Sequence, residues 1–131
     1  MTKLIHASGK RKCAIARATL RPGTGMVRIN SMSLNEFQPQ SLRLKLEEPF
    51  ILAENLGKTV NVNIVVNGGG ISGQIEAARL ATARALVQYD KKLEKVFLNY
   101  DRHLLVADIR RKETRKPNDS RARAARQKSY R

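Results

Sequence analysis

The chain has 131 residues, a length that suits one domain with a modest core and no need for a disulfide or metal staple. Its one cysteine, Cys13, excludes an intrachain disulfide, and the absence of a long apolar run or signal-like start predicts an unexported protein of a reducing compartment such as the cytoplasm. The formal net charge of +15 at pH 7 is typical of a protein that binds a polyanion.

The first predicted elements are two strands joined by a turn. Small or apolar residues from Ala14 to Leu20 alternate with Ile15, Arg17 and Thr19, which is the period-two pattern of a strand over residues 13–20. Residues 22–25 predict a turn, and residues 26–29 resume extended chain. We therefore expect a β-hairpin that carries arginines on one face.

The next elements are helical and then extended. Residues 33–37 predict a short turn or helical segment, and Ser41 is a candidate N-cap for a helix from about Leu42. Pro49 favours two short helices over one, and the alternation of leucines at positions 42, 44 and 46 leaves a strand as the alternative. Residues 60–66 alternate apolar and polar side chains and predict a strand.

The second half of the chain predicts two helices, a strand and an arm. An Ala-rich helix is expected over 72–89, a short helix over 91–100 and a last strand over 104–109. Beyond Arg110 there is no large apolar side chain until Tyr130, so this segment cannot bury enough surface to fold alone. We expect a globular domain over 1–109 with a basic N-terminal hairpin, and an extended basic arm over 110–131.

A glycine-rich turn connects the predicted strand 60–66 to the helix that follows. Gly68, Gly70 and Gly73 have the G-x-G-x-x-G spacing of dinucleotide-binding turns. The chain after Gly73 is too short for the second βα unit and substrate site that such a fold needs. The turn, which includes Gly69 and Gln74, therefore either allows close helix–sheet packing or presents backbone N–H groups to a phosphate.

Catalytic and metal sites are weakly indicated. Cys13 with His6 or His103 is the one candidate nucleophile–base pair, and a lone cysteine in a strand is typical of a small buried side chain. We expect a protein that is not an enzyme and uses no cofactor and no metal. A nucleotide-dependent enzyme built on the glycine turn is the alternative.

The excess charge lies at the two ends. Seven basic residues and no acid lie between Met1 and Arg28, ten basic residues and two acids lie beyond residue 109, and the middle is balanced. Nucleic acid is favoured over an anionic membrane because neither end is a basic amphipathic helix. The residues expected to contact phosphates are Lys10, Arg11, Lys12, Arg17, Arg21, Arg110, Arg111, Lys112, Arg115, Lys116, Arg121, Arg123 and Arg126.

The nucleic acid is expected to be an RNA recognised by shape and phosphate position. Aromatic residues make up 5% of the chain and tryptophan is absent, so base-stacking platforms are not expected. In the arm, small residues alternate with arginines and let the backbone approach crowded RNA.

Three segments resemble one known family. The run from Gly68 to Gln74, continued by the Ala/Arg helix through Leu86, is similar to the central signature of protein nine of the small ribosomal subunit. Residues 9–19 and the ending 127–131 also resemble that family, in the same order along the chain. The chain is identified as a member of this universal family, with the short N-terminus and the Lys-Ser-Tyr-Arg ending of its archaeal branch.

The resemblance implies a fold and a set of partners. The fold is a two-layer α+β domain with a mixed sheet, helices on one face and a left-handed βαβ crossover, like the second domain of ribosomal protein S-five. The implied partners are ribosomal RNA in the head of the small subunit, neighbouring head proteins and the peptidyl-site transfer RNA, with no membrane. The arm would contact the anticodon stem-loop backbone through Lys128, Tyr130 and Arg131. A free RNA chaperone is the rival hypothesis.

Overall fold

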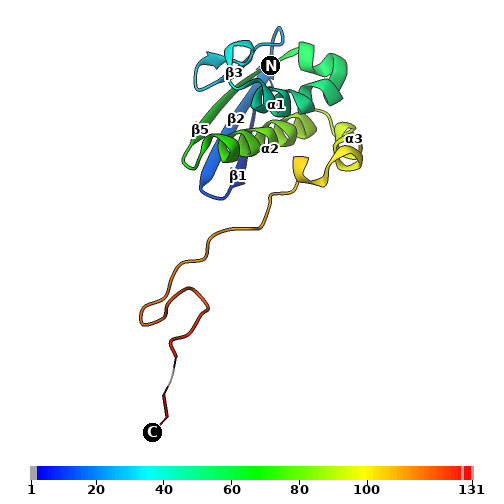
Figure 1. Ribbon diagram of the computed structural model, residues 1–131. Coiled ribbons are helices and arrows are strands. Elements are labelled where there is room, and N and C mark those ends of the chain that lie inside the picture. The colour runs from blue at the N-terminus through cyan, green and yellow to red at the C-terminus, as the bar shows by residue number, and fades with distance from the viewer. Residues whose placement is uncertain (1–2, 128, 131) are drawn as a thin grey trace.

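The computed structural model describes residues 3–127 and 129–130 and contains one five-stranded sheet with helices packed on one of its faces (Figure 1). The strand order is β1-β2-β5-β3-β4, and every neighbouring pair is antiparallel except β3 with β5. The strands are β1 (Ile5–Arg11), β2 (Ala14–Pro22), β3 (Val27–Ile29), β4 (Met32–Ser33) and β5 (Val60–Asn67). The predicted α+β class with a mixed sheet is confirmed.

The helices lie between and after the strands. α1 (Gln40–Ala53) and α2 (Ile71–Tyr89) pack side by side, and α3 (Leu93–Tyr100) contacts both (Figure 1). Short 3-10 helices are η1 (Leu34–Glu36), η2 (Glu54–Lys58) and η3 (Arg102–Leu104). The predicted strand 60–66, the Ala-rich helix and the short helix near 91–100 are therefore confirmed.

No helix in the described part of the chain is long and apolar enough to cross a membrane.

Small residues allow α2 to lie close against β1 and β2. The buried face of β2 is Ala14, Ala16, Ala18 and Leu20, and α2 presents buried alanines such as Ala77 toward the sheet. The contact is closest at the glycine of β1, residue 9, where an added Cβ would lie 2.4 Å from the carbonyl oxygen of Ala77. The Ala-rich helix is therefore a packing device, since larger side chains at these positions would force the two layers apart.

The predicted hairpin of residues 13–20 with 26–29 is wrong. β2 instead forms its hairpin with β1, around a turn at Lys12 and Cys13, and its other edge pairs with β5. The N-terminal strand was missed although Ile5 to Arg11 alternate in burial. β1 and β5 pair with nearly the whole of β2, so no edge of β2 is left for the shorter β3.

β3 is held on the far side of β5 by asparagine side chains. The Asn30 side chain accepts a hydrogen bond from the Val66 N–H at 2.9 Å and donates to the Val66 carbonyl, so it extends the parallel ladder. The Asn61 side-chain oxygen accepts from the N–H groups of Thr24, Gly25 and Met26 at 2.9 to 3.1 Å. These hydrogen bonds attach the segment that follows β2 to β5, so that β3 lies on the side of β5 opposite β2.

The predicted break at Pro49 is wrong, because α1 continues through it. The helix also starts earlier than expected, with Pro39 rather than Ser41 at the N-cap. Proline removes one helical hydrogen bond, but Pro49 and Leu46 are buried in the core. Tertiary packing therefore outweighs the local propensity. The short helix η2 follows directly after α1.

The predicted last strand over 104–109 is wrong as well. Leu104 is fully buried and ends η3, and the chain that follows does not pair with β1, although β1 is an edge strand with one free side. Its backbone is bound by a side chain instead, since Arg84 donates to the Leu105 carbonyl at 3.1 Å. Among the described residues beyond Leu104 there is no helix or strand, and the chain extends away from the sheet (Figure 1).

Candidate nucleic-acid interface

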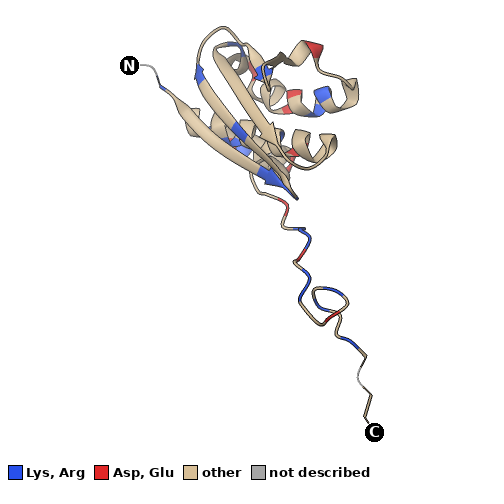
Figure 2. Ribbon diagram, turned by 90° about the vertical axis from the view of Figure 1, so that its left-hand side faces the viewer, with Lys and Arg blue, Asp and Glu red and all other residues tan. Residues whose placement is uncertain are grey.

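The helices cover one face of the sheet, and the other face is open (Figure 2). Burial alternates along β2 as far as Arg21 and along the whole of β5, so every second side chain of these strands points to the open face. In β2 the exposed positions include Ile15, Arg17 and Arg21, as the alternation in the sequence predicted. We call this surface the open sheet face. It comprises the outward side chains of β1, β2, β3 and β5.

Three arginines and a lysine give the open sheet face its charge. Arg17 and Arg21 lie four positions apart in β2, about 13 Å along the strand. Arg28 of β3 is aligned with Asn63 of β5, which pairs with a β2 residue midway between those arginines. Two strand spacings place Arg28 about 12 Å from each of them at the Cα atoms. Lys10 of β1 adds a fourth exposed cation.

No acid lies among these cations within the strands, since β1, β2, β3 and β5 contain no Asp or Glu. The remaining outward side chains are mostly neutral hydrogen-bonding groups, such as Ser8, Asn63 and Asn67. The His6 ring is 3.1 Å from the Thr19 hydroxyl on the same face. Arg28 and the asparagines were missed as site residues because their face depends on β3 pairing with β5, which no local pattern indicates.

The arm is the second cationic surface. Its basic residues at positions 111, 112, 115, 116, 121, 123 and 126 are all exposed. One of them, Arg123, has an acidic partner, because it bonds Glu113 at 2.8 Å while both side chains remain open to water. Tyr130 is 88% exposed, and the predicted residues Lys128 and Arg131 lie outside the described residues.

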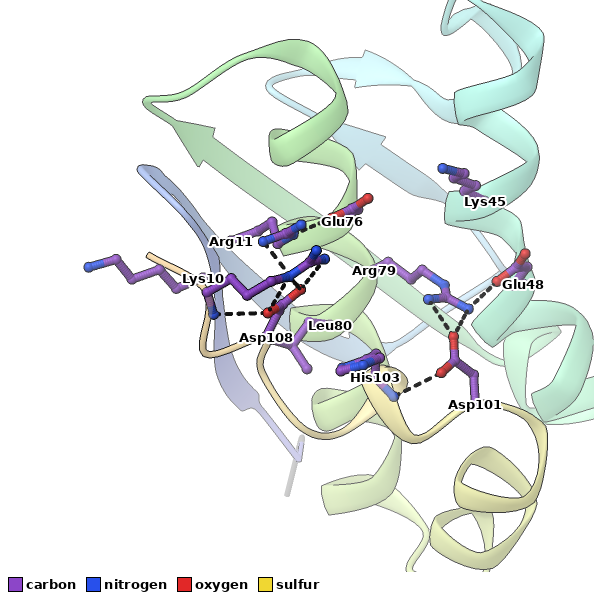
Figure 3. Close-up of a pocket in the computed structure, with 11 residues that line it drawn as sticks. Lys10, Arg11, Lys45, Glu48, Glu76, Arg79, Leu80, Asp101, His103 and Asp108 are labelled. Atoms are coloured by element: carbon purple, nitrogen blue, oxygen red, sulfur yellow. Dashed lines mark hydrogen bonds and ion pairs between the residues drawn. The ribbon is translucent and has the colours of Figure 1, made fainter. Parts of the chain in front are cut away.

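Two of the predicted phosphate-binding residues also form ion pairs within the fold. The side chain of Arg11 is 13% exposed and pairs with Glu76 of α2 and, at 3.3 Å, with Asp108 (Figure 3). Arg110 donates to the same Asp108 carboxylate at 2.8 Å. Hydrogen bonds from the Arg110 side chain, and then from its backbone N–H, hold the pKa of Asp108 far below its ordinary range.

These pairs fix the segment where the arm leaves the domain, residues 105–110, which we call the arm root. Arg84 of α2 donates both to the Leu105 carbonyl and to the Ser8 carbonyl of β1, at 3.1 and 3.0 Å. Arg11 reaches the arm root from the end of β1. The exit of the arm is thus attached to the sheet and to α2 at two points, and its direction is set by the fold.

A second ion cluster braces the helices. Arg79 of α2 pairs with Glu48 of α1 and, at 3.2 Å, with Asp101 before η3 (Figure 3). The His103 N–H donates to the Asp101 carboxylate at 3.0 Å, and this bond, with the Arg79 contacts, lowers the pKa of Asp101. Each acid here has a cationic partner, so the cluster connects α2 to α1 and to the start of η3 rather than forming a catalytic acid–base pair.

The glycine turn meets a conformational requirement. Gly68 and Gly69 have φ values of 77° and 64°, and an added Cβ on Gly68 would lie 2.6 Å from the Cys13 carbonyl oxygen. The Gln74 side chain of α2 donates back to the Gly68 carbonyl at 2.9 Å. Gly70 differs, because its φ is −102° and an added Cβ would meet nothing within 4 Å. Close packing therefore accounts for the first two glycines only.

The candidate catalytic residues are not brought together. Cys13 is an exposed free thiol in the β1–β2 turn, rather than the buried strand residue expected. His6 bonds Thr19 on the open sheet face, and His103 lies at the start of η3. Across residues 3–127 and 129–130 no group of three or more His, Cys, Asp or Glu side chains is placed to hold a metal ion.

The sequence of the whole domain and arm matches one family. The family described as Ribosomal protein S9/S16 matches residues 9–131. The chain belongs to the ribosomal protein S9 family. It is 47% identical to the small ribosomal subunit protein uS9 of Methanococcus maripaludis strain C7, over 98% of this chain and 99% of the relative. It is 46% identical, with the same coverage, to the uS9 protein of Methanococcus vannielii.

S9 family membership confirms the resemblance in the sequence, including its archaeal type, and makes the chain a structural ribosomal protein rather than an enzyme. The nucleotide-enzyme reading of the glycine turn is therefore set aside. Within this S9 protein the sequence-predicted cations fall into four groups: Arg17, Arg21 and Lys10 on the open sheet face, Lys12 exposed in the β1–β2 turn, the exposed arm residues, and the paired Arg11 and Arg110.

Proposed function

We propose that the chain binds ribosomal RNA in the head of an archaeal, cytoplasmic small ribosomal subunit through the open sheet face and the arm. The observation that carries this proposal is a sheet face that no helix covers and whose strands carry exposed cations and no acid. A protein surface of this kind repels itself until a polyanion neutralises it. The asparagines and hydroxyls between the cations supply neutral hydrogen bonds to sugar and phosphate oxygens.

The open sheet face is tested with the double variant Arg17→Gln/Arg21→Gln. Binding of a head-domain ribosomal RNA fragment is measured by filter retention between 50 and 200 mM salt. The log–log slope is expected to become shallower by about 2, because each neutralised phosphate contributes about 0.9. Lys91→Gln/Lys92→Gln removes two exposed cations from the α2–α3 connection and is the matched control. Equal slopes for the two double variants would refute the assignment.

We further propose that the arm reaches the peptidyl site and contacts the anticodon stem-loop backbone of transfer RNA through Lys128, Tyr130 and Arg131. The support is the family resemblance of the ending, together with an exposed arm whose exit is fixed at the arm root. Deleting residues 129–131 should leave subunit assembly intact and weaken transfer RNA binding at that site. Unchanged affinity in the truncated subunit would remove this role.

Two finer points of the fold are part of the proposal. β3 and β5 are parallel neighbours joined through α1, so they form a βαβ unit, and we propose the left-handed crossover of the second domain of ribosomal protein S-five. We also propose that 1–109 folds as a unit and that 110–131 orders only on RNA. Trypsin should then cleave beyond Arg110 in the free chain and leave the arm intact in the subunit.

A further inference from the structure

A groove with an apolar lining, unlike the two cationic surfaces, lies at the end of the molecule away from the arm. It has a volume of about 600 Å³ and is lined by residues from β3, η1, the second half of α1 and η2. Its apolar lining comes from Val27, Leu34, Phe50 and Ile51. Neither the open sheet face nor the described part of the arm contributes a cation to it, so the proposed RNA interface leaves it unexplained.

The helix beside the groove exposes apolar side chains that nothing in the fold covers. Ile51 is 65% exposed and Leu44, seven residues earlier on the same face of α1, is 50% exposed. Both belong to the helix whose opposite face supplies Leu46 and Ala53 to the core. α1 thus has a buried apolar side and a second apolar strip in water, which is the pattern of a surface that another molecule covers.

The charge of the strip is negative, in contrast to the rest of this strongly basic protein. Glu47 and Glu54 line the groove on either side of Ile51. Glu54 forms no ion pair within the described residues and is held at a φ of 52°, a conformation that a glycine would adopt with less strain. Among the residues that the structure describes, Glu47 has one partner, Arg43, at 3.6 Å, and Lys58 is the one cation that lines the groove.

We propose that this groove docks a segment of another protein that inserts a large apolar side chain between flanking lysines or arginines. The apolar lining takes the side chain, and Glu47 and Glu54 take the cations. RNA is the wrong occupant, because its phosphates would face two carboxylates across an apolar floor. Proteins that bind the same RNA carry cationic segments as this chain does, so they match the groove in charge. The chain then joins RNA on one surface to protein on the other.

The test uses the assembled small subunit with a photo-crosslinking amino acid in place of Asn55, an exposed residue on the groove. After irradiation of purified subunits, the crosslinked material is digested and identified by mass spectrometry. We expect one protein segment that contains a large apolar residue with neighbouring lysine or arginine. Adding Glu54→Lys should lower the crosslink yield about tenfold, because a like charge then faces the partner. Ile51→Ser should also lower it.

Ile71→Ser is the matched control, because Ile71 is 61% exposed but lies at the start of α2, outside the groove. It should leave the yield unchanged. Thermal unfolding of each variant chain is the check that the substitutions leave the fold intact. Crosslinks to RNA, to a second copy of this chain or to nothing would overturn the proposal, and so would a protein crosslink whose yield ignores Glu54→Lys and Ile51→Ser. RNA binding by the double arginine variant is measured separately. A failure of the docking proposal can therefore be distinguished from a failure of the proposed RNA interface.

Discussion

The glycine turn between β5 and α2 allows a prediction about how much its first glycine contributes to the free energy of unfolding. Gly68 adopts a φ of 77°, and its added Cβ would lie 2.6 Å from the Cys13 carbonyl oxygen. In Gly68→Ala the left-handed conformation costs about 1 to 2 kcal/mol. Relief of the overlap costs about 1 to 3 kcal/mol more. We therefore expect the free energy of unfolding to fall by about 2 to 5 kcal/mol.

Gly70→Ala is the control two residues away. Its φ is −102°, its added Cβ meets nothing within 4 Å, and it is the N-cap of α2. Alanine restricts the unfolded chain, which stabilises by about 0.4 to 1 kcal/mol, but it is a poorer N-cap than glycine by a similar amount. The free energy of unfolding should thus stay within about 0.5 kcal/mol of the native value.

The assay is thermal and urea unfolding of the purified full chain, followed by circular dichroism at 222 nm. For a domain of this size, the expected loss in Gly68→Ala corresponds to a fall in Tm of roughly 10 °C or more. Equal stability of Gly68→Ala and the native chain would refute the packing argument. RNA affinity of Gly70→Ala should be unchanged, and a loss of affinity in this folded variant would instead assign the turn to phosphate binding.

Three further predictions concern the arm root and the core. Asp108→Asn removes the shared partner of Arg11 and Arg110, so trypsin should cleave the free chain beside Arg110 faster than in the native protein; an unchanged rate would show that the ion pairs do not hold the arm root. Because the folded-state pKa of Asp108 lies below its ordinary value of 3.8, its contribution to stability is present above that pH and is lost as the pH falls below it. The protection of arm-root amides, measured by NMR as the exchange rate relative to that of the unfolded chain at the same pH, should therefore fall below about pH 4 in the native chain, with no such fall in Asp108→Asn. Finally, the buried Thr82 hydroxyl in α2 has no hydrogen-bond partner among the described residues, so Thr82→Val should raise the free energy of unfolding by about 1 kcal/mol in urea titrations, whereas a loss would mean that the hydroxyl is satisfied.

The elements with a strong internal period were predictable from the sequence. The alternation from Ala14 to Leu20 and from Val60 to Val66 gave two strands with the correct inward faces, and Arg17 was correctly placed on the outside. The Ala-rich helix after the glycines was also located to within one residue. In each of these cases the side chains of one face are buried together, so the spacing of apolar residues along the chain indicates which face is buried.

Strand partners were not predictable in the same way. The turn at Pro22–Gly25 suggested that residues 26–29 pair with the strand before them, whereas β3 pairs with β5, more than thirty residues away. The choice depends on Asn30 and Asn61, whose side chains bond backbone groups that only the folded chain brings near. For the same reason Arg28 could not be placed on the open sheet face in advance.

The sequence by itself determined the family, the two basic ends and the period of the main strands and the long helix, because these are properties of residue order and composition. Tertiary structure alone decided which cations are free. Arg11 and Arg17 are both arginines in the basic N-terminal stretch, yet Arg11 is bound between α2 and the arm root while Arg17 faces solvent on an acid-free sheet. The physical reason is that an ion pair depends on distance in space, and the acids that engage Arg11 lie far along the chain in residues 76 and 108.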